Sequence, residues 1–326
     1  RQRQMCIRDR ILGVGIMLWM KPEENGVWEG EKTVEPGIGQ VVLTLGDGES
    51  MPLKRDTNRL IFGGTMLQVR NERGTLVYSR IKSKEASEKI VYNTLTVPVR
   101  ERFQLVLADG TKVFLNSGSE MRYPERFGKA RREVFLKGEA WFEVAKDSAR
   151  EFWVHAGAMD VKVLGTSFNV KAYERLETVA TTLVEGSVEV ACAGKSFQIV
   201  PGEQFVYDKN NRVMDVRMVD TESYVSWKDG YYKFRQTTLE EIMETLSVWY
   251  GLNVFYVNES AKQVEFTGKV KRYEDARMLL DKFEQTGDVV FDIKGNNVFI
   301  TIKQKKPFAR EWNSFLVKAR GMVWQS

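Results

Sequence analysis

The feature of this sequence that most constrains its fold is a run of alternating apolar residues between positions 133 and 173. Apolar side chains occupy alternate positions over 134–144, and the alternation returns around 152–154, 161–163 and 168–170. A period of two indicates β-strands that bury one face. Glycines in this stretch can adopt the positive φ that tight turns or bulges require. These glycines are Gly138, Gly157 and Gly165.

A second pattern is an internal repeat. Residues 43–53 (LTLGDGESMPL) and 105–115 (LVLADGTKVFL) align without gaps, and each places Asp-Gly between two apolar runs. That arrangement is the strongest short-range signal for a β-hairpin, so the sequence predicts two related hairpins. From 103 to 219 strands recur about every ten residues with turn residues between them, which favours an all-β sandwich, roll or coil-like stack.

The character of the sequence changes near residue 228. We expect the order strand, helix, strand, strand, helix, strand, strand over 228–303. Thr237 or Thr238 caps the first predicted helix, and Gly251 ends it. We expect one small sheet with both helices packed on one face. The predicted fold class is therefore mainly β, with an all-β lobe of repeated hairpins followed by a small α+β lobe.

Composition excludes several classes of function. The chain has 326 residues, and 49 basic side chains are mixed with 44 acidic ones. Nucleic-acid binders concentrate charge on one face, so the net charge of +5 favours a solvated surface. Cys6 and Cys192 give neither a disulfide framework nor zinc spacing. His155 is the single histidine, and without a partner motif we expect it at the surface or in a turn.

Candidate catalytic groups are few. Glu139 and Glu143 lie four residues apart on one predicted strand, so they face the same side and could form a carboxylate pair of the glycosidase type. The alternative, which we favour, is that they are solvated or hydrogen-bonded. Residues 165–167 (GTS) form a corner before a strand and lack the glycines and lysine of a phosphate-binding loop. We therefore predict no enzyme, no cofactor and no metal site.

The segments GEAWFEV (138–144) and VLGTSFNVKAY (163–173) resemble the core signature of the FecR-like anti-sigma regulators. The flanks agree, with LADGTKVFLNSGSEMRYPERF (107–127) before them and TTLVEGSVEV (181–190) after them. The resemblance extends over about 37–302. The signature positions, expected to be structural, are Asp109, Gly110, Asn116, Tyr123, Pro124, Gly138, Glu139, Phe142, Glu143, Gly165, Thr166, Phe168, Asn169, Gly186, Pro201, Gly202, Trp227, Trp249 and Tyr250.

The resemblance implies a domain organisation: a FecR-like all-β periplasmic domain over 37–220 and a domain over 228–303 that resembles the secretin/TonB short N-terminal fold. One departure from the family is visible. The family usually has an Arg-Gly-Gly run just after the proline at position 98, where this chain has VRER (99–102). This departure concerns the local turn rather than the family.

The two ends of the sequence carry separate predictions. Residues 1–10 (RQRQMCIRDR) resemble a translated sequencing-adaptor remnant; the alternative is the basic flank of a membrane helix. Residues 11–20 are apolar but shorter than the roughly 20 residues that a membrane span needs. We interpret them as the outer half of a transmembrane helix that follows a cytoplasmic sigma-binding domain absent from this sequence. Residues 21–36 are predicted to be a linker. The basic tail, 304–326, is either an amphipathic helix or without structural meaning.

The resemblance implies transmembrane signal transduction. The partners would be the periplasmic signalling domain of a TonB-dependent outer-membrane receptor and an extracytoplasmic-function sigma factor. The protein would be anchored by a single span in the inner membrane, with this region in the periplasm and no role in binding nucleic acid. The nutrient taken up could be an iron chelate or a glycan. The alternative function is a carbohydrate-binding β module without signalling, in which Trp141, Trp153 and Tyr123 line a sugar-binding face.

Overall fold

The structure is a computed structural model that describes residues 39–53, 59–63, 67–72, 75–80, 90–272 and 275–303. By its contacts the chain divides into Arg1–Glu35 and Pro36–Ser326, and every described residue belongs to the second unit. The expectations for residues 1–10, 11–20, 21–36 and 304–326 lie outside the described residues.

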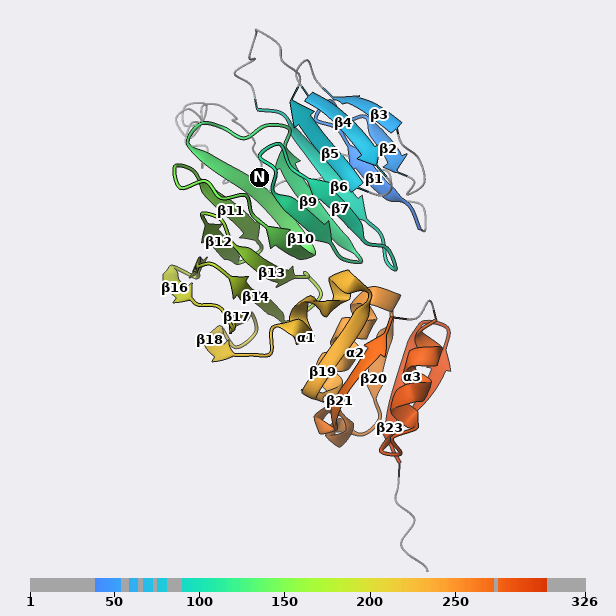
Figure 1. Ribbon diagram of the computed structural model, residues 1–326. Helices are drawn as coiled ribbons and strands as arrows, with labels where there is room; N and C mark the ends of the chain where they lie inside the picture. The colour runs from blue at the N-terminus through green and yellow to red at the C-terminus, as the bar shows by residue number, and fades with distance from the viewer. Residues whose placement is uncertain are drawn as a thin grey trace, which may run out of the picture. The chain divides into compact units, whose positions relative to one another are not determined.

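The described residues of the first lobe form 18 strands, and their pairings define two β-sheets with one strand in common. These strands are coloured from blue to yellow in Figure 1. The first sheet runs, in spatial order, through β2 (Ser50–Leu53), β1 (Val41–Thr44), β6 (Tyr92–Val97), β9 (Ser119–Pro124), β10 (Arg131–Glu143), β11 (Glu151–Ala156), β12 (Met159–Val163), β15 (Val188–Cys192) and β16 (Lys195–Ile199). The second runs through β3 (Arg59–Gly63), β4 (Leu67–Glu72), β5 (Thr75–Arg80), β7 (Phe103–Val106), β8 (Lys112–Leu115), β10, β13 (Ser167–Ala172), β14 (Thr178–Glu185), β17 (Glu203–Asp208) and β18 (Val213–Met218).

Strand β10 joins the two sheets because its halves pair with different neighbours. Residues 131–137 pair with β9 and β11, and residues 138–143 pair with β8 and β13. Gly138 lies at the transition with φ of 100°, so the glycine expected at a turn or bulge lies inside a long strand. A Cβ at this position would lie 2.7 Å from Ser119 Cα, which only glycine avoids.

The two sheets face each other across one apolar core. Phe142 from the second sheet packs on Phe168 at 5.2 Å between ring centroids and on Phe152 of the first sheet at 6.2 Å. Tyr78 and Tyr123 meet from opposite sheets, with 2.9 Å between their hydroxyl oxygens. These contacts bury the apolar face that the alternation predicts, and the expected sandwich is confirmed.

Both predicted hairpins of the internal repeat are present with equivalent registers. Leu43 pairs with Met51 in β1–β2, and the corresponding Leu105 pairs with Val113 in β7–β8. In each turn the Asp side chain accepts a hydrogen bond from the backbone N–H two residues later. The repeats lie in different sheets of the sandwich.

The second lobe begins after a short helical segment and follows the predicted order of elements. Its elements are α1 (Glu222–Val225), the 3₁₀ helix Ser226–Asp229, β19 (Tyr231–Thr238), α2 (Leu239–Tyr250), β20 (Asn253–Tyr256), the 3₁₀ helix Glu259–Gln263, β21 (Glu265–Lys271), α3 (Ala276–Glu284), β22 (Val289–Lys294) and β23 (Asn297–Ile302). The expected single sheet is wrong. The strands form a two-stranded sheet, β19–β21, and a three-stranded sheet, β20–β23–β22.

The two small sheets and the helices share one apolar core. Phe283 of α3 packs on Phe234 and Phe266 of the β19–β21 sheet, and Leu279 and Leu280 of the same helix belong to this core. Helix α2 begins where predicted: the Thr238 side chain accepts a hydrogen bond from the Glu241 N–H at 3.3 Å. It ends at Gly251, with φ of 69°.

Candidate functional site: a polar cavity at the lobe junction

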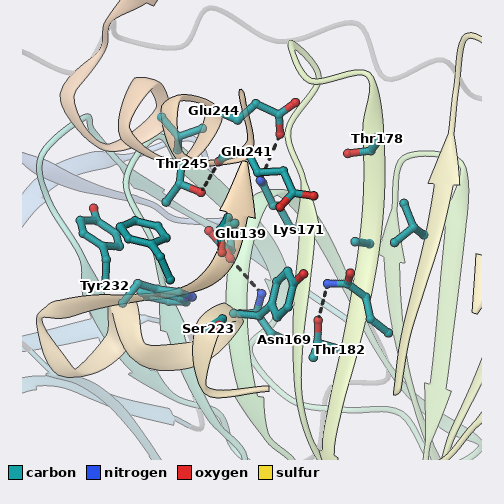
Figure 2. A pocket seen from close by; sticks show the side chains of 18 of the residues that line it. Glu139, Asn169, Lys171, Thr178, Thr182, Ser223, Tyr232, Glu241, Glu244 and Thr245 are labelled. Atoms are coloured by element: carbon teal, nitrogen blue, oxygen red, sulfur yellow. Dashed lines mark hydrogen bonds and ion pairs between the residues drawn. The ribbon is translucent and has the colours of Figure 1, made fainter. Parts of the chain in front are cut away.

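A cavity of about 300 Å³ lies where the second sheet of the β lobe meets α2 and β19 (Figure 2). Its β-lobe side chains come mainly from β13, β14 and β17, and the opposite wall comes from residues 223–248. The figure shows Asn169 directed at Glu139, and Lys171 directed at Glu244. Most of the lining groups are polar, which is unusual for the junction of two apolar cores.

Glu139 is the buried acid of this cavity, and only 8% of it is exposed. Alternation along β10 places Ala140 and Phe142 in the sandwich core and directs Glu139 to the opposite face. Its two carboxylate oxygens each accept a hydrogen bond of 2.8 Å, one from Asn116 Nδ2 and one from Asn169 Nδ2. Asn116 follows directly after β8, and Asn169 lies in β13. Both strands pair with β10, so the pairing of the three strands builds the site.

Burial raises the pKa of Glu139 above its ordinary value of 4.5. Lys171 and the two asparagine amides oppose this shift because they stabilise the charged carboxylate. Tyr173 lies near the same carboxylate, and burial, reinforced by the charge of Glu139, raises the pKa of its phenol. The site therefore holds a carboxylate whose charge is balanced by hydrogen bonds and one nearby cation.

The two lobes are joined by Trp141, which belongs to β10 but packs into the core of the second lobe. It is 4% exposed, and its indole Nε1 donates to Glu143 at 3.2 Å. Sequence alternation predicts that one of Trp141 and Phe142 faces outward. The structure makes Trp141 that outward residue and covers it with the second lobe.

Backbone groups at the end of α2 extend this junction. The Ser117 hydroxyl lies 3.1 Å from the Val248 carbonyl oxygen and 3.3 Å from that of Trp249. The Arg100 N–H donates to the Trp249 carbonyl at 3.1 Å, and Arg102 donates to the carbonyl of Lys228. Arg100 has φ of 69°, a left-handed conformation, at the second position after Pro98 where the family usually has glycine.

The structure brings four of the signature positions together and leaves the others in separate places. Asn116, Glu139, Asn169 and Trp227 line the cavity. Asp109 and Gly110 form the β7–β8 turn, Tyr123 and Pro124 end β9, and Phe142 and Phe168 stack in the core. Turns or corners contain Gly165, Thr166, Gly186, Pro201 and Gly202. Glu143 forms an ion pair with Lys112. Trp249 and Tyr250 are the last two residues of α2.

Sequence reasoning missed Arg132, a fully buried charge that supports the β lobe. Its Nη1 donates to Asp109 Oδ2 and to the Ala145 carbonyl, both at 2.8 Å, and its Nη2 donates to the Arg150 carbonyl. The signal was present in the sequence, because Arg132 has the same parity as Val134 and therefore points inward. Lys171 was also missed as a lining residue of the cavity.

The alternative sugar-binding face is wrong for two of its three residues, Trp141 and Tyr123. Trp141 is covered by the second lobe, and Tyr123 is fully buried with its hydroxyl on Tyr78. Trp153 is half-buried and stacks on His155. His155 lies in β11 rather than in a turn, and its Nδ1 is 2.7 Å from Asp160 Oδ1.

The described ranges contain no cluster of three His, Cys, Asp or Glu side chains placed to hold a metal ion. Cys192 is a free, buried thiol in β15. Within the same ranges, none of the helices combines the length and the hydropathy that crossing a membrane requires.

The fold and the site define a mainly β protein of two lobes joined at a buried polar junction, and known proteins share this organisation. The family model "FecR protein" matches residues 93–189, and the model "FecR, C-terminal" matches residues 231–300. The chain belongs to the FecR family and carries the FecR C-terminal domain. A comparison with curated proteins found no match.

Two solved structures are similar to this chain over about two thirds of its length. Both are crystal structures of what is described as a "putative anti-sigma factor" from Parabacteroides distasonis ATCC 8503, at 1.65 Å and 2.50 Å resolution. The first is 28% identical with a TM-score of 0.59, and the match covers 64% of this chain and 98% of that one. The second is 27% identical with a TM-score of 0.59, and the match covers 65% and 99%.

Proposed function

We propose that this chain is the periplasmic part of an anti-sigma regulator that relays the state of a TonB-dependent outer-membrane receptor to an extracytoplasmic-function sigma factor. The observation that carries the proposal is the match to the FecR and FecR C-terminal families in sequence order. Similarity to a protein described as an anti-sigma factor supports it. The family consists generally of regulators rather than enzymes, so the role assigned to the chain is binding.

In this proposal, residues 11–20 belong to a single span in the inner membrane, and the described lobes lie in the periplasm. The receptor's signalling domain binds the second lobe, and the change passes along the chain to the sigma factor on the cytoplasmic side. The stretch ILGVGIMLWM supports the anchor because it is uncharged and ends in aromatic and apolar residues.

The docking surface proposed for the receptor domain is the outer face of the β20–β23–β22 sheet. Phe255 is 47% exposed and stacks on Phe299 at 5.1 Å between ring centroids. Val257 and Val290 are also exposed large apolar side chains of this sheet region. Exposed apolar side chains that cluster on one face are typical of protein-binding surfaces.

Calorimetric titration of the whole chain with the isolated periplasmic signalling domain of the receptor encoded beside it tests the proposal. We expect saturable binding with a dissociation constant in the micromolar range or below, roughly −8 kcal/mol or stronger. Phe255→Glu should abolish the heat, because it places a charge in the apolar face. Met218→Glu, at an exposed position of β18, is the matched control and should bind as the unaltered chain does.

Two results would contradict this account. Absence of heat with both proteins shown to be folded would exclude direct docking of the receptor domain. Binding that survives Phe255→Glu unchanged would retain the relay but move the docking surface away from the β20–β23–β22 sheet.

A further inference from the structure

The cavity at the lobe junction contains buried polar atoms that the protein itself leaves without hydrogen bonds. Within the described ranges, Asn116 Oδ1, Asn169 Oδ1 and Ser223 Oγ have no hydrogen-bond partner. The two asparagines are 6% and 3% exposed, and all three residues line the cavity. Leaving a buried acceptor unsatisfied is costly, so such groups in a cavity indicate a place for hydrogen-bond donors.

The carboxylate of Glu139 adds two more acceptor atoms to the same end of the cavity. Each of its oxygens accepts one asparagine N–H, and a carboxylate oxygen can accept a second hydrogen bond. The amide nitrogens of both asparagines are committed to Glu139, so their oxygens are the amide groups left for another donor. The Nε1 donor of Trp227, another lining residue, is also without a partner. This end of the cavity therefore offers several acceptors and one donor, which suits hydroxyl groups because they can both donate and accept.

Glu139 is hydrogen-bonded rather than ion-paired, and the charge of Lys171 acts on it without an ion pair. Several other charged groups around the cavity have partners of opposite sign. Lys171 lies 3.6 Å from Glu244, and Arg217 lies 4.0 Å from Glu241. Lys233 pairs with Asp220 at 3.0 Å and with Glu222. Glu240 pairs with Lys262 at 3.4 Å. An ionic ligand that bound to these paired groups would have to disrupt one of the pairs, whereas a neutral one would not.

The remaining walls are aromatic and aliphatic. Trp227, Tyr232 and Phe234 line the cavity from the second lobe, and Ala180 and Val206 line it from paired strands of the first. Aromatic faces beside amide and carboxylate acceptors suit the C–H faces and hydroxyl groups of a polyol. The volume of about 300 Å³ lies at the lower end of the range for small-molecule sites.

We propose that this cavity is a binding site for a small, neutral, polyhydroxylated ligand of monosaccharide size. Its hydroxyl groups donate to Asn116, Asn169 and Glu139, and its less polar face lies against the aromatic wall. Because the lining comes from both lobes, the bound ligand holds the two lobes together. Binding therefore stabilises the joined arrangement by an amount that grows with the logarithm of the ligand concentration above the dissociation constant.

The test is isothermal titration calorimetry of the whole chain with four neutral sugars: D-glucose, D-galactose, D-mannose and D-xylose. We expect at least one to give saturable heat at one site per chain with a dissociation constant of about 1 mM or tighter. D-glucosamine and D-glucuronate are the charged comparisons and should bind at least about tenfold more weakly than the best neutral sugar. No saturable heat from any neutral sugar, or equal binding of a charged one, overturns the proposal.

A cavity-filling variant locates the binding site. Ala180→Phe adds a ring inside the cavity without removing a polar group, and it should reduce sugar affinity by more than about tenfold. Val213→Phe, at an exposed position of β18 that does not line the cavity, is the matched control and should bind normally. Unchanged binding by a folded Ala180→Phe chain overturns the assignment to this cavity.

Hydrogen–deuterium exchange of the unaltered chain provides a readout that does not depend on a variant folding. With saturating sugar, amides of both β14 and α2 should exchange more slowly; protection of neither, or of one lobe only, overturns the bridging site. The proposal does not rest on the receptor relay. If the chain binds the receptor's signalling domain but no sugar, only this inference is wrong. If it binds a sugar but not the signalling domain, only the proposed relay is wrong.

Discussion

At the scale of single residues, Glu139 shows how burial and pairing combine. A carboxylate removed from water is costly unless it is hydrogen-bonded, and here two asparagine amides and the Lys171 charge offset part of that cost. Burial still prevails, since the pKa of Glu139 remains raised. The protonated form is therefore favoured more strongly in the folded protein than in the unfolded chain.

This shift predicts a pH dependence of stability. The contribution from the raised pKa of Glu139 is fully present below about pH 4.5 and is lost as the pH rises through the folded-state pKa. Glu139→Gln cannot titrate. The free energy of unfolding of the wild type minus that of the variant should therefore fall as pH rises above 4.5, by at most about 1.4 kcal/mol per pH unit, and then become constant.

Urea unfolding of both proteins between pH 4 and pH 8 measures this difference. Thr182→Val is the control, because it alters a lining residue of the cavity without adding or removing a titratable group. Its difference from the wild type should not depend on pH. If the difference in unfolding free energy between the wild type and Glu139→Gln is also independent of pH, Glu139 has the same pKa in the folded and unfolded states.

Arg100 is a second residue with a measurable cost. Its φ of 69° is unfavourable for any residue with a Cβ, while its backbone N–H is held by Trp249 and Ser117. Arg100→Gly keeps that N–H and should raise the free energy of unfolding by about 1 kcal/mol. Val99→Gly, at the preceding exposed position, is the control and should give no gain. A loss of stability in Arg100→Gly would mean that the arginine side chain matters more than the backbone.

At the scale of elements, β10 determines how the two sheets meet. Its inward residues supply the sandwich core, its outward residues Glu139 and Trp141 form the lobe junction, and Gly138 permits the change of partners. Disturbing the middle of β10 should therefore affect both sheets together.

Gly138→Ala tests this role. The added Cβ would meet the backbone of Ser119 at 2.7 Å and would also occupy a positive φ, so the free energy of unfolding should fall by more than about 2 kcal/mol. Gly268→Ala in β21 is the matched control, since a Cβ there meets no atom within 4 Å. Chemical unfolding measures both. Equal effects of the two substitutions would remove the special role of Gly138.

Local patterns predicted the elements well because strands, Asp-Gly turns and helix caps depend on neighbouring residues. The internal repeat gave two hairpins with matching registers, and Thr238 caps α2 as expected. Parity along β10 also placed Glu139 and Glu143 on one face. Parity could not supply Asn116 and Asn169, because they reach Glu139 only through the pairing of β8 and β13 with β10.

Non-local pairing also explains the wrong prediction of one small sheet. The order of strands in the second lobe was readable, but which strands pair is decided by contacts between segments far apart in sequence. β20 pairs in parallel with β23, whereas β19 pairs with β21, from which α2 and β20 separate it in the sequence. No turn signal records those choices.

At the scale of the whole molecule, Cys192 offers a reporter of global unfolding. It lies in the sandwich core at 2% exposure, and burial raises the pKa of its thiol, so alkylation requires the β lobe to open. In a Cys6→Ser chain, the rate of iodoacetamide labelling should increase with urea in parallel with the loss of β-sheet circular dichroism. Labelling at the rate of a free thiol without urea would contradict the buried position.

The hairpins that follow β10 are added alternately to the first and the second sheet. β11–β12 adds to the first sheet, β13–β14 to the second, β15–β16 to the first and β17–β18 to the second. Each new hairpin pairs with the previous hairpin of its own sheet, so none requires earlier strands to re-pair. The lobe can thus change in length by whole hairpins at its β18 end, as solenoid proteins do by repeats. Loss of the β17–β18 hairpin would remove Gln204 and Val206 from the cavity wall but would keep the pairing of β8, β10 and β13 that holds Glu139.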